Sequence, residues 1–266
     1  MSASDNDGEM PAEVRRQHIL SFIKGREFVR VADLSTHFRV SDVTVRSDLD
    51  VLAEQGQIRR VRGGAMPDIR PNLERPFEET QASHSKEKQA IGRVAASLVT
   101  SGQTIILDVG TTTTAVARAL IDRTNLHDVV IFTNSLNIAF ELEPAIPRFT
   151  VILTGGTLRP MQHSLIDPLG GLLLDRITAH IAFLGCNGID HLGGVTNINL
   201  PETEIKRRML RAMRRIVVAD GSKVGQVEVA YLCEAKDIDV LITDESADPG
   251  EVAALRERDV EVLIAR

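Results

Sequence analysis

The sequence predicts a two-domain α/β protein, in which a small helical domain precedes a larger and mostly parallel α/β domain. The chain has 266 residues, enough for two hydrophobic cores of these sizes. Helical apolar spacing dominates residues 11–65, whereas short aliphatic runs alternate with helical stretches across residues 84–266. Residues 66–83 are polar and contain three prolines, so we expect a linker without a regular element there.

The overall composition is that of a folded protein outside the membrane. The chain is 43% hydrophobic and 26% charged, and no apolar run approaches the roughly 18 residues of a membrane helix. Residues 1–10 lack the features of a secretory signal, and we expect them to form a disordered tail on a cytoplasmic protein. Cys186 and Cys233 have no metal-ligand spacing, so we expect reduced thiols, no metal and no cofactor.

The net charge of −6 conceals an uneven distribution along the chain. Residues 11–67 carry ten Arg or Lys against seven Asp or Glu, a net charge of +3. Residues 68–266 carry 21 basic against 27 acidic side chains, and the first ten residues add three acids. The small domain is therefore the basic one, which is compatible with a nucleic-acid partner.

The small domain is predicted to contain three short helices. Residues 11–25 show helical apolar spacing between a proline suited to a first turn and a glycine suited to a stop. A second helix is predicted over residues 31–38, and Ser41 is a good N-cap for a third. The third helix has only a narrow apolar stripe, formed by Val45, Leu49 and Leu52.

A basic hairpin follows, because QIRRVRGGA (57–65) alternates loosely and contains two glycines. Three helices and this hairpin predict a winged helix-turn-helix over residues 11–65, with the polar face of the third helix in the DNA major groove. The expected DNA-binding residues are Thr44, Arg46 and Ser47 for bases, Arg59, Arg60 and Arg62 for phosphates, and Ser41 at the helix start.

An alternative for this segment is a protein-interaction domain with a solvated face. Four acids on the third helix favour it, because they repel a polyanion: Asp42, Asp48, Asp50 and Glu54. Asp48 lies about 60° from the apolar stripe on a helical wheel and could instead be bonded inside the domain.

The larger domain is predicted from near-continuous apolar runs separated by helical stretches, the pattern of a mostly parallel sheet covered on both faces. The predicted strands are residues 104–109, 129–133, 149–154, 180–185, 215–220, 240–244 and 260–264.

The stretch LDVGTTTTAVARAL (107–120) places one glycine and four threonines between a predicted strand and a helix. Backbone N–H groups at such a helix start, joined by hydroxyl donors, favour a phosphate or carboxylate. The threonines could equally cap the helix. The dinucleotide fingerprint is absent, because the second and third glycines of G-x-G-x-x-G are missing.

Other loops are expected at the same edge of the sheet, since ligands gather at the carboxyl ends of parallel strands. Asn134 follows one strand, Gly155 and Gly156 follow the next, CNG (186–188) follows another, and Lys223 follows a fourth. The segment IKRRMLRAMRR (205–215) is also basic, but Ile205, Met209 and Met213 predict an amphipathic helix with a solvated basic face.

Residues 31–65, VADLSTHFRVSDVTVRSDLDVLAEQGQIRRVRGGA, resemble the DNA-binding segment of the DeoR family of bacterial transcriptional regulators, nearly continuously. Ser47 stands where that family usually has a second arginine, and Arg62 where it usually has a histidine. These departures imply a changed operator preference.

The motifs LDVGTTTTAVA, TNSLNIA, LTGG, FLGCNGID, PETEIKRRM and VADGSKVG resemble those of the family's sensor domain, whose fold is related to sugar-phosphate isomerases and CoA-transferases. Asp167 stands where the family often has glycine, which implies a changed ligand preference. The resemblance implies an effector site formed by Asp108, Gly110, Thr111, Thr112, Thr113, Asn134, Gly155, Gly156, Asn187, Lys206 and Lys223.

The resemblance implies a homo-oligomeric repressor of a sugar or carbohydrate catabolic operon. It would bind a double-stranded DNA operator, would be released by a phosphorylated sugar, and would have no catalytic residues. The alternative is a sugar-phosphate isomerase-like enzyme with an appended DNA-binding domain, in which Asp108 is a base and Lys223 a phosphate clamp. No motif positions a second carboxylate for that chemistry.

Overall fold

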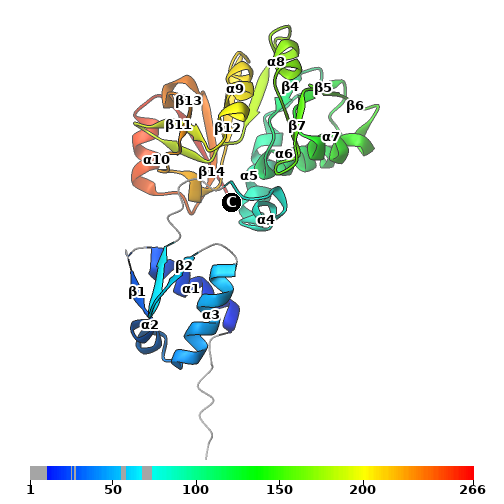
Figure 1. The fold of residues 1–266 in the computed structure, drawn as a ribbon. Coiled ribbons are helices and arrows are strands. Elements are labelled where there is room, and N and C mark those ends of the chain that lie inside the picture. Colours follow the sequence, from blue (N-terminus) through cyan, green and yellow to red (C-terminus); the bar gives the residue numbers. More distant parts are fainter. Residues whose placement is uncertain (1–10, 25, 27, 55–57, 68–73) are drawn as a thin grey trace, which may run out of the picture. The chain divides into compact units, whose positions relative to one another are not determined.

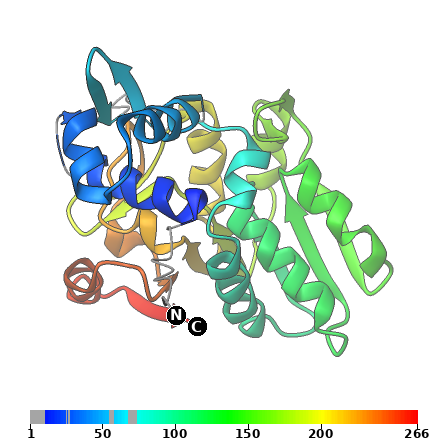
Figure 2. The ribbon, with the colours of Figure 1, turned by 90° about the horizontal axis from the view of Figure 1, so that it is seen from below.

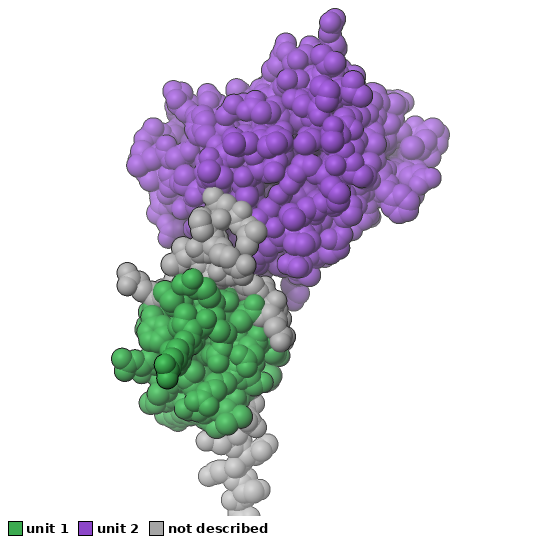
Figure 3. Space-filling view, in the orientation of Figure 1, with its two compact units in different colours: residues 1–71 green, residues 72–266 purple. Residues whose placement is uncertain are grey.

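A computed structural model describes residues 11–24, 26, 28–54, 58–67 and 74–266. The predicted tail, residues 1–10, lies outside the described residues. The chain divides into two compact units, residues 1–71 and 72–266, which Figure 3 colours separately. No helix in the described ranges is both long enough and apolar enough to span a bilayer.

Unit 1 contains the three predicted helices and the predicted hairpin (Figure 1). Its helices are α1 (Ala12–Lys24), α2 (Val31–Phe38) and α3 (Asp42–Glu54). Its strands are β1 (Val29–Arg30), β2 (Ile58–Val61) and β3 (Gly64–Pro67), which form an antiparallel sheet in the order β1-β3-β2. This is the arrangement of a winged helix-turn-helix, with β2 and β3 as the wing.

The narrow apolar stripe of α3 is the part of the helix that packs. Val45, Leu49 and Leu52 are at most 2% exposed, and they join residues of the other helices in one core. Ser41 caps the helix, because its Oγ accepts a hydrogen bond from the backbone N–H of Thr44 at 3.1 Å. The outward face of the helix, on which Ser41, Arg46 and Ser47 are exposed, is therefore available for contacts outside the unit.

Unit 2 is built on one seven-stranded sheet in which every neighbouring pair is parallel. Its strands are β4 (Thr104–Leu107), β5 (Val129–Thr133), β6 (Phe149–Leu153), β9 (Ile181–Leu184), β12 (Arg214–Val218), β14 (Val240–Asp244) and β15 (Glu261–Ala265). Their order is β15-β14-β12-β9-β4-β5-β6. All seven predicted strands are confirmed, and all their carboxyl ends meet at one edge of the sheet.

Helices cover both faces of this sheet. One core contains side chains of α5 (Ser85–Ser97), α6 (Thr111–Asp122) and α7 (Leu136–Leu142), and Figure 2 shows α5 and α6 side by side. The other core contains side chains of α8 (Leu169–Leu174), α9 (Leu200–Met209) and α10 (Pro249–Arg256). Adjacent strand residues alternate between the two cores, as Ile105 and Ile106 do, because successive side chains of a strand point to opposite faces.

Several short elements of unit 2 carry no periodic signal in the sequence. The hairpin of β7 (Thr157–Arg159) and β8 (Ser164–Ile166) is antiparallel. A second antiparallel sheet contains β10 (Gly188–Asp190), β11 (Gly194–Asn197) and β13 (Ala230–Cys233). Single 3-10 turns are η1 (Glu143–Ala145), η2 (Gly221–Lys223) and η3 (Ala235–Asp237).

The predicted linker, residues 66–83, differs from the structure at both ends. Residues 66 and 67 belong to β3, and Phe77–Ala82 forms a short helix, α4. The Phe77 side chain is only 4% exposed, its ring lies against that of His163, and its backbone N–H bonds Met161 O at 3.0 Å. One buried aromatic residue fixes this helix on the β7–β8 hairpin, although the polar composition of the stretch predicts none.

The predicted amphipathic helix over 205–215 is wrong in its second half. Helix α9 ends at Met209, and β12 begins at Arg214. Ile205 and Met209 are buried as expected, but Met213 is 71% exposed. Pairing of β12 with β9 and β14 requires extended backbone from Arg214 onward, so the chain leaves the helix before the third apolar position.

Candidate DNA-binding surface and effector site

The start of α3 presents a polar outward surface. Ser41, Arg46 and Ser47 are exposed, whereas Thr44 is half-buried with its Oγ1 2.8 Å from Ser41 Oγ. Val43 on the same face is 73% exposed. A helix that exposes both short polar residues and an arginine in its first two turns has the side chains that reach base edges in a major groove.

Arg46 is weakly held in the structure. Its guanidinium lies 3.9 Å from Asp42 Oδ2, and the two side chains are 58% and 50% exposed. An ion pair of this exposure contributes well under about 1 kcal/mol. Arg46 can therefore exchange Asp42 for a base or phosphate at little cost.

Asp48 does not face solvent. Arg15 Nε lies 2.6 Å from Asp48 Oδ2, with both side chains at least 92% buried, so this acid belongs to the interior of unit 1. The repulsion that four acids on α3 would exert on DNA is reduced accordingly. Glu54 is the last residue of α3, and its side chain lies outside the described part of the chain.

The wing arginines differ in their surroundings. Arg60 Nε lies 3.0 Å from Asp50 Oδ1, so this residue ties the wing to α3. Arg59 points to the opposite side of β2 and is exposed, as is Arg62 in the turn. The turn is completed by Gly63, whose φ of +84° lies in the region that favours glycine. Arg59 and Arg62 are thus the wing residues best placed to contact phosphate.

In unit 2, the carboxylate of Asp108 lies at the end of β4 and is fully buried. Its Oδ2 is 2.8 Å from Lys206 Nζ and accepts the backbone N–H of Gly185 at 3.1 Å. Burial raises the pKa of Asp108 to about 6, although the Lys206 charge opposes that rise. Two chain segments predicted separately, the strand end at 108 and the basic segment at 206, therefore meet in one site.

Lys206 is 3% exposed and is surrounded by oxygen atoms. Besides Asp108, its Nζ donates to Gly185 O at 2.9 Å and to Asn197 Oδ1 at 3.1 Å, and it lies 3.7 Å from Glu202 Oε1. Burial alone lowers the pKa of Lys206, but the two carboxylates outweigh it and raise that pKa. Lys206 is therefore a permanent buried cation at the strand-end edge.

Two polar atoms in this site have unused hydrogen-bonding capacity. Among the described residues, Asp108 Oδ1 and Asn197 Nδ2 are buried without a hydrogen-bond partner. Buried polar groups are normally satisfied, so an acceptor and a donor left over beside Lys206 suit a ligand that carries both hydroxyl and anionic groups.

The N-cap residue of α6 is Gly110, which offers no side-chain cap, and the threonines after it do not cap the helix either. Thr113 and Thr114 donate their hydroxyls to Gly110 O at 2.9 and 2.7 Å, and Thr112 is also buried. Gly110 and Thr111 are half-buried at the edge. The capping alternative is therefore not supported, and the backbone N–H groups of the first turn remain suited to an anion.

Asn134 joins three strand ends. It is fully buried, its Oδ1 accepts the backbone N–H of Val109 at 2.9 Å, and its Nδ2 reaches Leu165 O at 3.5 Å. Because both ends of the amide are used by backbone, Asn134 holds the loops after β4 and β5 against β8. Asn134 can therefore contribute to an effector site by positioning these loops.

Gly155 and Gly156 turn the chain from β6 into β7. Their φ values are +74° and +125°, and a Cβ on Gly156 would lie 2.0 Å from Ile166 O. Asp167, the residue directly after β8, has Oδ1 3.5 Å from Arg208 on α9. The extra carboxylate is therefore paired with a basic side chain of α9.

Asn187 and Lys223 lie on the loops after β9 and β12. Asn187 Oδ1 accepts the backbone N–H of Ile198 at 3.1 Å, so this side chain also fixes a loop. Lys223 ends the turn η2 and is half-buried. Within the described ranges, no carboxylate forms an ion pair with Lys223. Of the predicted effector residues, Lys223 is the cation most available to a ligand.

Sequence reasoning missed several side chains around this edge. Lys88 on α5 is 4% exposed, and its Nζ donates to Thr80 O and Ser83 O at 2.6 and 2.7 Å. Burial lowers its pKa, and the charges of Asp220 and Lys223 act on it from nearby. Asn197, Glu202 and Arg159 were missed as well. Arg159 follows the Gly155–Gly156 turn by three residues and Glu202 lies in PETEIKRRM, so a local signal existed for these two, but none existed for Lys88 or Asn197.

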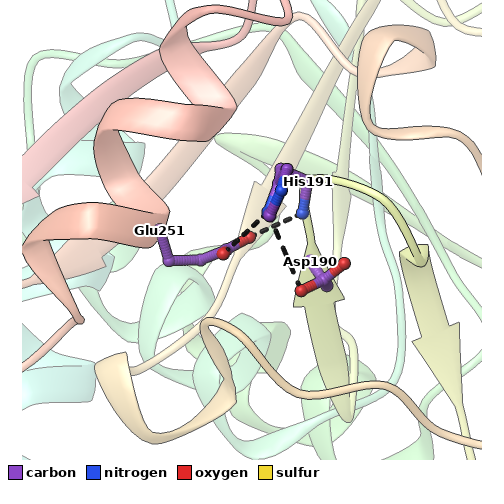
Figure 4. A group of neighbouring side chains, drawn as sticks. All are labelled: Asp190, His191 and Glu251. Atoms are coloured by element: carbon purple, nitrogen blue, oxygen red, sulfur yellow. Dashed lines mark hydrogen bonds and ion pairs between the residues drawn. The ribbon is translucent and has the colours of Figure 1, made fainter.

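A further group of potential metal ligands is shown in Figure 4. His191 Nδ1 lies 2.9 Å from Glu251 Oε2 and 3.9 Å from Asp190 Oδ2. The other oxygens are engaged by backbone: Glu251 Oε1 accepts from His191 N, and Asp190 Oδ1 accepts from the N–H groups of residues 192 and 193. These bonds fix the β10–β11 turn to α10.

The two cysteines are free thiols. Cys233 is buried and Cys186 is half-buried, and burial raises the pKa of each to about 12. Neither thiol is therefore suited to nucleophilic chemistry at neutral pH.

Comparison with known families matches both units. The DeoR-like helix-turn-helix domain matches residues 15–68, and the DeoR C terminal sensor domain matches residues 83–245. Weak structural likenesses include ribose 5-phosphate isomerase A from Methanocaldococcus jannaschii (18% identity, 53% of this chain and 55% of that one, TM-score 0.40) and the sorbitol operon regulator SorC from Klebsiella pneumoniae (13%, 99% and 97%, 0.34). Likenesses at this level carry no information on activity.

Curated relatives cover nearly the whole chain. The HTH-type transcriptional regulator YulB of Bacillus subtilis, described as uncharacterized, is 34% identical over 93% of this chain and 95% of its own length. A putative aga operon transcriptional repressor of Escherichia coli O157:H7 is 33% identical over 99% of both chains. The glycerol-3-phosphate regulon repressor of Escherichia coli K12 is 33% identical over 86% of this chain and 90% of its own. The protein therefore belongs to the DeoR family of transcriptional regulators.

Proposed function

We propose that this protein represses a sugar or carbohydrate catabolic operon and leaves its operator when a phosphorylated sugar binds unit 2. The observation that carries the DNA-binding part is the polar, exposed start of α3 beside a wing with exposed Arg59 and Arg62. Relatives at about one-third identity bear the names of operon and regulon repressors, which supports the sign of regulation.

The effector site proposed here lies at the carboxyl ends of β4, β5, β6, β9 and β12. Lys206 and Lys223 supply positive charge, the start of α6 supplies N–H groups, and Asp108 and Asn197 supply an unused acceptor and donor. Together these groups suit an anion that also carries hydroxyls. The effector controls the protein if it binds the conformation with poor DNA affinity more tightly, in which case DNA must weaken effector binding equally.

Two measurements test this proposal with the full-length protein. Binding to DNA from its own promoter region should be specific at low ionic strength and should fall steeply with salt, because phosphate contacts release counterions. Thermal stabilisation by a panel of pentose, hexose and triose phosphates should identify the effector. Failure to bind promoter DNA in the absence of every sugar phosphate would contradict the proposed function.

We further propose that the protein acts as a homo-oligomer, since winged helix-turn-helix readers commonly bind paired half-sites, and that it performs no catalysis. Asp108 is fully buried and paired with Lys206, which does not favour a base that must reach substrate carbon. Light scattering of the purified protein tests the first statement. Incubation with pentose and hexose phosphates tests the second, and measurable turnover would favour the isomerase alternative.

A further inference from the structure

A continuous series of charged side chains connects the proposed effector site to Glu74, near the N-terminal boundary of unit 2. Asp108 contacts Lys206, which lies 3.7 Å from Glu202 Oε1. Glu202 Oε2 lies 2.5 Å from Arg159 NH1 on β7. The other nitrogen of the same guanidinium, NH2, bonds Glu74 Oε2. The five charges alternate in sign, and their side chains are 0 to 16% exposed.

Glu74 stands at a mechanically important place in the chain. It lies near the N-terminal boundary of unit 2, which begins at residue 72, and α4 begins three residues after Glu74. Residues 74–78 bond the β7–β8 hairpin and its turn, and helix α4, which begins at Phe77, also packs against α6. Besides the Arg159–Glu74 bond, Gln162 Nε2 donates to Arg75 O at 2.6 Å and His163 Nε2 lies 2.8 Å from Glu78 Oε1.

The hairpin is also attached to the proposed effector loops. It starts directly after Gly156, the N–H of Leu165 bonds Asn134 O at 2.7 Å, and Ser164 Oγ donates to Glu202 at 3.2 Å. One face of the hairpin therefore meets groups of the strand-end edge, and its other contacts hold residues 74–78.

Resting on the proposed function, we propose that Arg159 reports effector occupancy to residues 74–82, by dividing its guanidinium between Glu202 and Glu74. An anion that attracts Lys206 weakens the interaction of Lys206 with Glu202. Glu202 then has Arg159 as its remaining basic partner among the described residues and draws the guanidinium toward itself. Glu74 loses part of its ion pair, and the start of unit 2 is held less tightly.

Two substitutions distinguish this role of Arg159 from a purely structural one, because they should change the stability of residues 74–82 in opposite directions. Arg159→Gln removes the bridge and should loosen residues 74–82. Glu202→Gln leaves Arg159 with one full carboxylate, Glu74, and should tighten the same residues. If Glu202 and Arg159 served only to stabilise the hairpin, both substitutions would loosen it, because each removes one partner of a largely buried ion pair.

Amide hydrogen exchange of the full-length protein, without DNA or added effector, measures the difference. The readouts are the amides of Phe77 and Thr80, which bond Met161 O and Pro76 O. We expect roughly tenfold faster exchange in Arg159→Gln, as for the loss of a charge-assisted hydrogen bond. We expect exchange to be roughly threefold slower in Glu202→Gln, the size of a modest gain in one ion pair.

A second ion pair of unit 2 supplies a control for the exchange experiment. Arg214→Gln breaks another arginine–glutamate pair, with Glu261, at the amino ends of β12 and β15, and should leave both amides unchanged. If Glu202→Gln does not fold, Asp108→Asn replaces it with the same expected sign, because Lys206 then turns toward Glu202. The inference would be overturned if exchange in Glu202→Gln, or in Asp108→Asn where that variant replaces it, were as fast as in wild type or faster. Unchanged exchange in Arg159→Gln would also overturn it.

These results are separable from the test of the proposed function. A protein that ignores its promoter would contradict the repressor proposal while leaving the exchange pattern intact. A protein that binds its promoter but shows no opposite-signed exchange would retain the repressor proposal and lose the role of Arg159.

Discussion

Lys206 Nζ lies 2.8 Å from Asp108 Oδ2, and neither side chain is more than 3% exposed. The two residues are far apart in sequence and come from the helical segment after β11 and the end of β4. A buried ion pair is costly to form, because both charges lose their hydration. Removing only one partner is strongly destabilising, because the other charge is left buried without a counter-charge. Its position at the edge where the other predicted effector loops meet makes it the best candidate for the centre of the effector site.

The first prediction concerns pH. Burial raises the pKa of Asp108 from its usual 3.8 to about 6. Stability that comes from the protonated form is fully present below the usual pKa and is lost as pH rises through about 6. Asp108→Asn does not titrate, so wild type should lose stability relative to this variant between pH 4 and pH 7, by ~3 kcal/mol at most. Urea unfolding followed by circular dichroism measures it, and parallel pH profiles would contradict it.

The second prediction concerns the effector cation. Lys223→Ala should retain the wild-type affinity for promoter DNA while losing the response to the sugar phosphate that stabilises the wild-type protein. The reason is that Lys223 is half-buried at a strand end and forms no ion pair with the described carboxylates. Lys236→Ala is the matched control, because Lys236 is 65% exposed and already paired with Glu234. A normal effector response in Lys223→Ala would remove Lys223 from the site.

The third prediction separates base contacts from phosphate contacts. Arg46→Ala should cost about 1 to 3 kcal/mol of operator binding and relax sequence preference, if Arg46 contacts a base. Arg59→Ala should weaken binding to all sequences alike and reduce the salt slope by about 1. Fluorescence anisotropy with operator and scrambled DNA at several salt concentrations measures both effects. If Arg46→Ala lost the same affinity for operator and scrambled DNA, Arg46 would be assigned to a phosphate contact instead.

The fourth prediction concerns the interior of unit 1. Asp48→Ala removes a buried ion pair with Arg15 and should destabilise unit 1 by about 3 kcal/mol. Asp50→Ala removes a pair in which the acid is 60% exposed and should change stability by less than about 1 kcal/mol. Amide exchange of α3 in the full-length protein measures the two variants side by side. Equal protection in both would show that burial of the Arg15 pair has no energetic consequence.

The fifth prediction compares two glycines with positive φ. Gly156→Ala places a Cβ 2.0 Å from Ile166 O, so the β6–β7 turn must move. Gly63→Ala has a φ of +84° but no atom within 4 Å of the new Cβ, so only backbone strain of about 1 kcal/mol is expected. Thermal unfolding should show the larger loss for Gly156→Ala, together with a weakened effector response. A loss no larger than that of Gly63→Ala would show that the turn adapts freely.

The fold could be predicted where the sequence repeats a simple physical pattern. Strands buried on both faces, such as β12 and β14, are near-continuous aliphatic runs, and the packing stripe of α3 falls at helical spacing. The short strands β7, β8, β10 and β11 contain three or four residues each, too few for any period. Helix α4 depends on a single buried phenylalanine. The failure at Met213 arose because helical spacing continued by chance into residues that sheet pairing requires to be extended.

Apart from Lys206, which the PETEIKRRM motif supplied, the candidate site was predictable only at its strand ends. Asp108, Asn134 and Lys223 follow recognisable apolar runs, and parallel topology brings such positions together. Arg159 and Glu202 are 43 residues apart, and Glu74 lies 85 residues before Arg159. Their partnership depends on how the β7–β8 hairpin folds back over the sheet edge, which no local pattern specifies. The geometry also corrected roles: Asn134, Asn187 and Thr113 use hydrogen-bonding groups to hold loops.

The basic run after Glu204 has a different consequence when its surroundings are included. Arg208 and Arg211 face Asp175, Arg214 faces Glu261, Arg215 faces Asp239, and Arg207 faces Glu204. The segment is strongly basic in the sequence, but in the folded structure the neighbouring acidic side chains nearly neutralise its charge. Unit 2 should therefore contribute little to nonspecific DNA binding. The search for an operator among nonspecific sites then depends on the small basic unit alone.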